Sequence, residues 1–128
     1  MWYAAHLITT LRAKREEGDA AEEPARPIQA WEDVILVDAA DPDDAIHKAT
    51  EFGTREAAED SKDLVIDDKP AVYELIGVRK LSEIGEKVTG HKQAPNIIEV
   101  TTTELEIRND FDLLQLARGG EVLLRYVS

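Results

Sequence analysis

Four long apolar segments rich in β-branched residues constrain the fold of this chain more than any other feature. They occupy positions 2–11, 31–39, 70–81 and 97–108, and each is typical of a β-strand. Two of them, 31–39 and 70–81, would place apolar side chains on both faces of a sheet, whereas a sheet with one solvated face alternates between apolar and polar. We therefore expect an α+β fold with more apolar strand surface than short helices can cover.

The clearest local signal follows the second segment, in the sequence Ala-Asp-Pro-Asp-Asp at positions 40–44. Asp41 is suited to cap a helix, Pro42 to occupy its first position, and the next two aspartates to meet the positive end of the helix dipole. Apolar residues then recur at helical spacing to about residue 58, which predicts the main crossover helix. A short second helix is predicted at 111–118, before Gly119 and Gly120, and a fifth strand at 122–127.

These segments predict one α+β domain over residues 1–128 with the order ββαββαβ. The sheet is expected to be mostly antiparallel and four- to five-stranded, with the helices packed on one face. A charged stretch at about 14–29, containing two prolines and a glycine, predicts a mobile loop between the first two strands.

Composition excludes several classes of protein. The chain has no cysteine, which excludes disulfides, thiolate metal sites and a cysteine nucleophile. It carries 27 acidic and 15 basic residues, a net charge of −12, which argues against nucleic acid as a partner. We see no secretory signal, no apolar run of the roughly 20 residues that a membrane span needs, and no metal or cofactor motif. We therefore expect a cytoplasmic protein without membrane contact, metal or cofactor.

Seven aromatic or ionisable side chains on the predicted strands are candidates for contact with a ligand or partner. The aromatic ones could anchor a partner or simply fill the core. The two glutamates share a strand face, where they could act as acid and base or keep that face soluble, and the arginine could balance one of them or hold an anion. No catalytic residue is assigned. The candidates are Trp2, Tyr3, His6, Trp31, Arg79, Glu104 and Glu106.

The apolar strand surface also predicts self-association. Two modest helices are too few to cover both faces of the sheet, so we expect the second face to be buried by a second copy of the chain, as a two-fold dimer. The alternatives are a sheet that curls around a pocket, or long loops that cover the face within one chain.

Two sequence blocks carry a resemblance to a known family. Trp-Tyr-Ala-Ala-His-Leu at 2–7 and Trp-Glu-x-x-x-Leu-x-x-Ala at 31–39, with further stretches at 77–81, 104–108 and 112–126, resemble a family of small uncharacterised bacterial proteins, a domain of unknown function. The resemblance implies a bacterial, cytoplasmic protein. It supplies no activity, cofactor or site residues.

The sequence favours a non-catalytic binding or protein-interaction module, with a basic protein as one fitting partner because of the acidic charge. The alternative is a small-molecule-binding or enzymatic α+β domain with a pocket between sheet and helix. A flat apolar patch would favour the first, and a concave pocket with converging polar groups the second.

Overall fold

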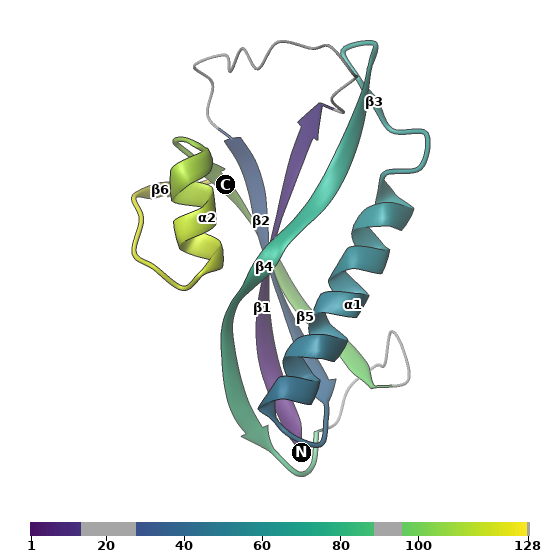
Figure 1. The fold of residues 1–128 in the computed structure, drawn as a ribbon, viewed down its shortest axis with the longest axis vertical. Coiled ribbons are helices and arrows are strands. Elements are labelled where there is room, and N and C mark those ends of the chain that lie inside the picture. The colour runs from purple at the N-terminus through teal and green to yellow at the C-terminus, as the bar shows by residue number, and fades with distance from the viewer. Residues whose placement is uncertain (14–27, 89–95, 128) are drawn as a thin grey trace.

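In the computed structural model, which describes residues 1–13, 28–88 and 96–127, six strands form an antiparallel sheet in the order β3-β4-β1-β2-β5-β6 (Figure 1). Two helices, α1 (Pro42–Asp60) and α2 (Asp110–Ala117), pack on this sheet. The α+β class and the antiparallel sheet are therefore confirmed. The strands are β1 (Trp2–Ala13), β2 (Ile28–Asp38), β3 (Val65–Ile66), β4 (Lys69–Gly85), β5 (Ile97–Ile107) and β6 (Leu124–Tyr126).

The predicted strand count and the order ββαββαβ are wrong in detail because of β3. This two-residue strand lies in a polar stretch and pairs with the start of β4, Val65 opposite Pro70. The turn between them places Asp67 and Asp68 at φ values of 51° and 64°. Aspartate tolerates this left-handed backbone, which suits tight hairpins. Such a strand is too short to show the alternation by which strands are recognised in a sequence.

The first helix begins where the sequence predicted. The Asp41 carboxylate accepts a hydrogen bond of 2.8 Å from the Asp44 N–H, and Pro42 is the first helical residue. The buried face of α1 consists mostly of small residues, which let the helix lie close to the sheet. These residues are Ala45, Ala49, Phe52, Gly53 and Ala57.

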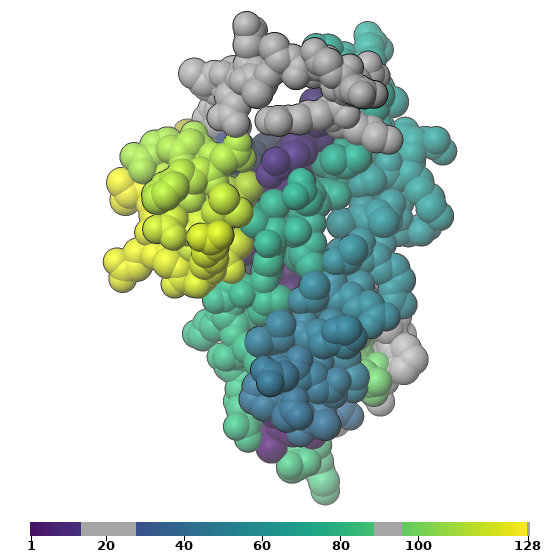
Figure 2. Space-filling view, in the orientation of Figure 1, coloured from purple at the N-terminus to yellow at the C-terminus, as the bar shows by residue number. Residues whose placement is uncertain are grey.

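The two helices pack on opposite faces of the sheet, so the expectation that both lie on one face is wrong. Leu7 belongs to the core cluster that contains Phe52 of α1, whereas its neighbour Ile8 belongs to the cluster that contains Leu113 of α2. Adjacent residues of a strand point to opposite faces. Figure 2 shows α1 and the C-terminal region as separate masses on either side of β4.

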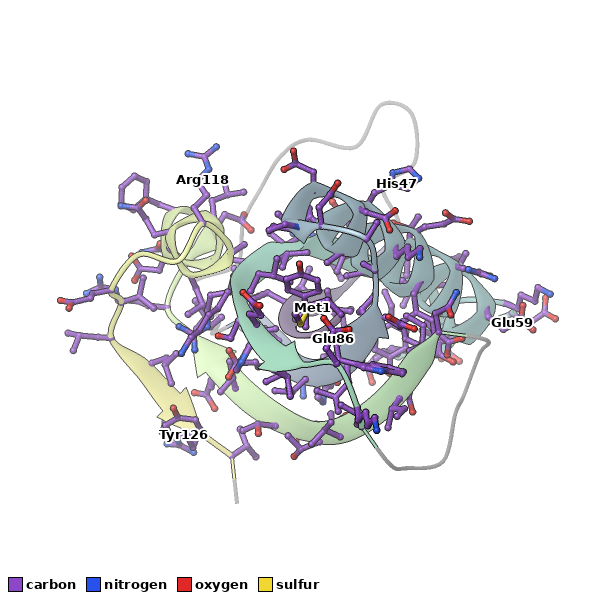
Figure 3. The ribbon with its side chains drawn as sticks, turned by 90° about the horizontal axis from the view of Figure 1, so that it is seen from below. Met1, His47, Glu59, Glu86, Arg118 and Tyr126 are labelled. Atoms are coloured by element: carbon purple, nitrogen blue, oxygen red, sulfur yellow. The ribbon has the colours of Figure 1, made fainter. Side chains whose placement is uncertain are left out.

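Irregular pairing makes the sheet coil. The register between β1 and β4 shifts three times, which leaves Ile76, Arg79 and Ile84 of β4 without a partner residue on β1. Such bulges increase the local twist of a strand. In the end-on view of Figure 3, β4 curves around Met1. On the face that α2 covers, Ala4 and Ile98 are also buried, so more of this face is sheltered within one chain than the sequence led us to expect.

The loop expected at about 14–29 lies outside the described residues, apart from Ile28 and Gln29, which begin β2. Neither of the described helices combines the length and apolar character needed to cross a membrane. Self-association through the sheet stays a prediction.

Candidate functional site

A cavity of about 290 Å³ opens between the sheet and the C-terminal half of α1. Its volume is close to the lower end of the range of small-molecule sites, about 300 Å³. The sheet side is formed by residues from four strands, and the helix side by the last three turns of α1. The lining residues are Leu7, Thr9, Trp31, Asp33, Val34, Ile35, Phe52, Gly53, Glu56, Ala57, Asp60, Tyr73, Glu99, Thr101 and Thr102.

The position of α1 over the sheet is set at two points beside the cavity. At Gly53, a Cβ atom would lie 3.0 Å from Cδ2 of Leu75 and 3.2 Å from Cδ1 of Leu7, so the absence of a side chain allows close packing. At the C-terminal end, the Ser61 hydroxyl donates to the Ala57 carbonyl at 2.6 Å and accepts from the Tyr73 N–H at 2.7 Å. The end of the helix is thereby fixed to β4 next to the cavity.

Two aromatic side chains form one wall of the cavity. Trp31 of β2 and Tyr73 of β4 are half-buried, and their ring centroids are 5.5 Å apart with an interplanar angle of 65°. This edge-to-face arrangement is a favoured geometry for aromatic pairs. The rings meet across β1, where Thr9 is paired with Trp31 and Leu11 with Tyr73.

Four carboxylates line the cavity from three elements: Asp33 on β2, Glu56 and Asp60 on α1, and Glu99 on β5. The Thr102 hydroxyl donates to Oδ1 of Asp33 at 2.7 Å. Among the described lining residues there is no lysine, arginine or histidine. Within the described part of the chain, none of the four carboxylates takes part in an ion pair.

The environment of the cavity disfavours negative charge. Burial raises the pKa of Asp33, and the nearby charge of Asp60 raises it further, while the hydrogen bond from Thr102 acts in the opposite direction. Glu99 is exposed as a whole residue, but partial desolvation of its carboxyl group raises its pKa, as do the negative charges of Glu56, Asp33 and Asp60. A positive charge in the cavity would lower the pKa of both carboxyl groups.

The four carboxylates do not form a metal centre. Across residues 1–13, 28–88 and 96–127, no group of three or more histidine, aspartate or glutamate side chains has an arrangement that could hold a metal ion. The carboxylates surround the cavity instead of converging on one point.

Of the seven residues that the sequence singled out, Trp31 lines the cavity and the two glutamates lie outside its described lining. Glu104 is paired with Trp31 across β2 and β5, and its Oε1 accepts from Nε2 of Gln29 at 3.3 Å. Glu106 lies 3.8 Å from Arg125 on β6. Each glutamate thus has a partner of its own.

His6 and Arg79 come together on the other side of the sheet. Arg79 Nε donates to Oε2 of Glu32 at 2.5 Å, and His6 Nδ1 lies 3.5 Å from the same oxygen. The expected balance of Arg79 with Glu104 or Glu106 is not found, because β1 and β2 lie between β4 and β5. Arg79 is one of the bulged residues of β4, whose side chains such bulges redirect.

Trp2 and Tyr3 are buried, at 6% and 5% exposure, so neither presents an aromatic surface at the rim of the sheet. Tyr3 belongs to the core cluster beneath α1, and burial raises the pKa of its hydroxyl.

Sequence reasoning missed most of the cavity. Asp33 offered a signal, since it shares the face of Ile35 and Val37 and is the polar residue of that otherwise apolar series. Tyr73 and Glu99 offered none. Their approach to Trp31 and Asp33 depends on the register between four strands, which local sequence patterns do not encode.

The fold and the cavity define the class of this protein: a small α+β protein with a coiled antiparallel sheet and a ligand-sized pocket beneath its main helix. A family model described as a domain of unknown function (DUF4288) matches residues 2–94, and the chain belongs to this family. A comparison with curated proteins and one with solved structures each found no match. The matched region contains Trp31, Asp33 and Tyr73, whereas Glu99 on β5 lies beyond it.

Proposed function

We propose that this protein is a binding module whose ligand site is the pocket between the sheet and α1. The observation that carries the proposal is that a half-buried aromatic pair and four carboxylates line the same concave space. Ligand sites combine apolar and aromatic walls with a few oriented polar groups in this way. The pocket favours recognition of a small group over docking through a flat apolar face.

An enzymatic role is the second candidate, and one observation favours it. The pKa values of Asp33 and Glu99 are raised, and carboxyl groups perturbed in this way within a cleft are typical of general acids. Binding takes precedence because the same perturbation arises wherever carboxylates crowd into a partly buried pocket.

The test of the proposed function is a thermal-shift screen of the whole chain with small organic cations, anions and neutral polar compounds. Thr101 is exposed and lines the pocket, so Thr101→Phe should fill the pocket without disturbing the core. Thr54→Phe, on the exposed side of α1, is the matched control. We expect at least one class to raise the Tm of the parent protein and of Thr54→Phe, but not that of Thr101→Phe. If no compound discriminates between the two variants, the pocket is not the binding site.

Assembly and location belong to the same proposal. We infer a cytoplasmic bacterial protein that self-associates through its sheet and suits a basic partner because of its net charge of −12. Light scattering at high micromolar concentration tests the assembly, and we expect a mass twice that of the 14.3 kDa chain. A mass of 14.3 kDa at that concentration would remove self-association from the proposal without affecting the pocket.

A further inference from the structure

We propose that the group bound in the pocket is an organic cation, an ammonium or guanidinium, held against the rings of Trp31 and Tyr73 by the carboxylates of Asp33 and Glu99. This inference rests on the proposed function, because it names the chemical class of ligand for the same pocket.

The described residues that line the pocket leave its negative charge unbalanced. Elsewhere among the described residues, two carboxylates that are well shielded from solvent, Glu32 at 18% and Asp112 at 8% side-chain exposure, have a cation of the same chain beside them. Glu32 pairs with Arg79, and Asp112 lies 2.9 Å from Arg108. The pocket brings four carboxylates together, and its described lining supplies no cation. A partly buried negative site of this kind is complementary to a positive charge from outside the chain.

The aromatic wall of the pocket supports the same class of ligand independently of the carboxylates. An indole ring is the best aromatic partner for an organic cation, and tyrosine also serves. Trp31 is half-buried and lines the pocket together with Tyr73, whose ring lies edge-to-face with it. Aromatic rings do not ligate hard metal ions, and the described carboxylates do not converge as metal ligands would. The combination therefore selects an organic cation.

The four carboxylates differ in exposure, and this difference predicts the orientation of the ligand in the pocket. Asp33 is half-buried and held by Thr102, whereas Glu56, Asp60 and Glu99 are exposed. The cationic head would reach Asp33 beside the rings, and the exposed carboxylates would attract it and hold any second positive group. The volume of about 290 Å³ suits one arginine-like or lysine-like chain.

Such a head group could belong to a free small molecule or to a side chain of a peptide, and the test separates these sources. Isothermal titration calorimetry of the full chain would compare N-acetyl-arginine amide with N-acetyl-citrulline amide, which replaces the guanidinium with a neutral urea. Agmatine represents a free dication, and a capped Gly-Gly-Arg-Gly-Gly peptide represents a side chain. The NMR signal of the Trp31 indole N–H reports whether binding occurs in the pocket.

We expect the arginine probe to bind at least tenfold more tightly than the citrulline probe and to shift the Trp31 signal. Asp33→Asn and Glu99→Gln should each weaken binding about tenfold. Glu121→Gln, which removes an exposed charge beyond α2, should change binding by less than twofold. Tighter binding of agmatine than of the peptide would assign a small molecule as the source, and the reverse order a protein side chain.

Equal affinity for the arginine and citrulline probes would overturn the proposal of a cationic ligand. Equal losses of affinity in Asp33→Asn and Glu121→Gln would also overturn it. So would the absence of binding by every cationic probe. If the thermal-shift screen still finds a compound of another class that Thr101→Phe excludes, the proposed function stands without the cation. If no compound in the screen distinguishes Thr101→Phe from the parent protein either, both the proposed function and the cationic ligand are ruled out. Circular dichroism melts of each variant establish that a loss of binding is not a loss of fold.

Discussion

At the scale of single residues, the Asp33 carboxylate lines the pocket but lowers the stability of the folded protein. It occupies a strand position whose neighbours on the same face, Ile35 and Val37, are buried in the core. A hydrophobic residue would pack better there, so the carboxylate weakens the fold unless a ligand compensates its charge. Residues that break a local folding rule in this way are frequent at functional sites.

Asp33→Asn should therefore make the protein more stable at neutral pH. The raised pKa of Asp33 means that the folded state keeps its proton where the unfolded state has lost it. The stabilisation from this protonated group is complete below the ordinary value of 3.8 and is lost as the pH rises through the raised value. Asparagine keeps an oxygen acceptor for the Thr102 hydroxyl but does not titrate.

Urea unfolding between pH 4 and pH 8 checks this prediction. The free energy of unfolding of Asp33→Asn relative to the parent should increase with pH and be positive at pH 7. Glu121→Gln serves as the control, because its difference from the parent should be small across this range. An Asp33→Asn variant that is less stable than the parent at every pH would contradict the raised pKa as the dominant effect.

The core provides a second prediction at this scale. Ile35 is 1% exposed and Phe52 is 6% exposed, and they belong to the same cluster beneath α1. Truncation of either residue to alanine should lower the free energy of unfolding by about 2–5 kcal/mol, because it leaves a cavity. Thr54→Ala on the exposed side of α1 should change it by at most ~0.5 kcal/mol. Equal effects in a urea titration would show that the assignment of faces is wrong.

At the scale of elements, the sequence predicted the features that depend on neighbouring residues alone, namely the start of the main helix and the four long strands. The cap at Asp41 and the proline after it define the start of α1, and the β-branched segments define β1, β2, β4 and β5. The face on which α2 packs and the partner of Arg79 could not be predicted, because both depend on the strand order. Trp31 was found as an aromatic residue on a strand, whereas its contact with Tyr73 required the register across β1.

Ser61 provides the prediction at this scale, because it joins the end of α1 to β4. Ser61→Ala removes the hydroxyl that accepts from the Tyr73 N–H and leaves this half-buried donor without its partner. A buried group that loses its partner costs about 1–3 kcal/mol, so the free energy of unfolding should fall by roughly that amount. Thr54→Ala is again the control in urea titrations. Because Tyr73 is part of the aromatic wall, the variant should also weaken the binding of any ligand in the pocket. An unchanged free energy of unfolding in Ser61→Ala would show that this hydrogen bond does not stabilise the link between α1 and β4.

At the scale of the whole molecule, the negative charge of the pocket is part of an excess of acidic residues over the chain. The chain carries 12 more negative than positive charges, and the acidic residues extend from the pocket along the exposed side of α1. In Figure 3, His47 and Glu59 lie on the outer side of this helix, away from the sheet. Such a surface raises the local concentration of cations, and its own repulsion works against the compact state. Attraction for a positive ligand and a loss of stability thus have the same origin.

This shared origin predicts that sodium chloride stabilises the protein at neutral pH. Salt screens the repulsion, since the Debye length falls from about 30 Å at 0.01 M to about 8 Å at 0.15 M. We expect the Tm at pH 7 to rise by roughly 3–6 °C over this range, equivalent to about 1 kcal/mol for a chain of this length. At pH 4.6, the isoelectric point of the sequence, the net charge is close to zero and the salt effect should disappear. Calorimetry at the two pH values separates net charge from other effects of salt, because an equal rise at both would mean that net repulsion is not what limits the stability of this fold.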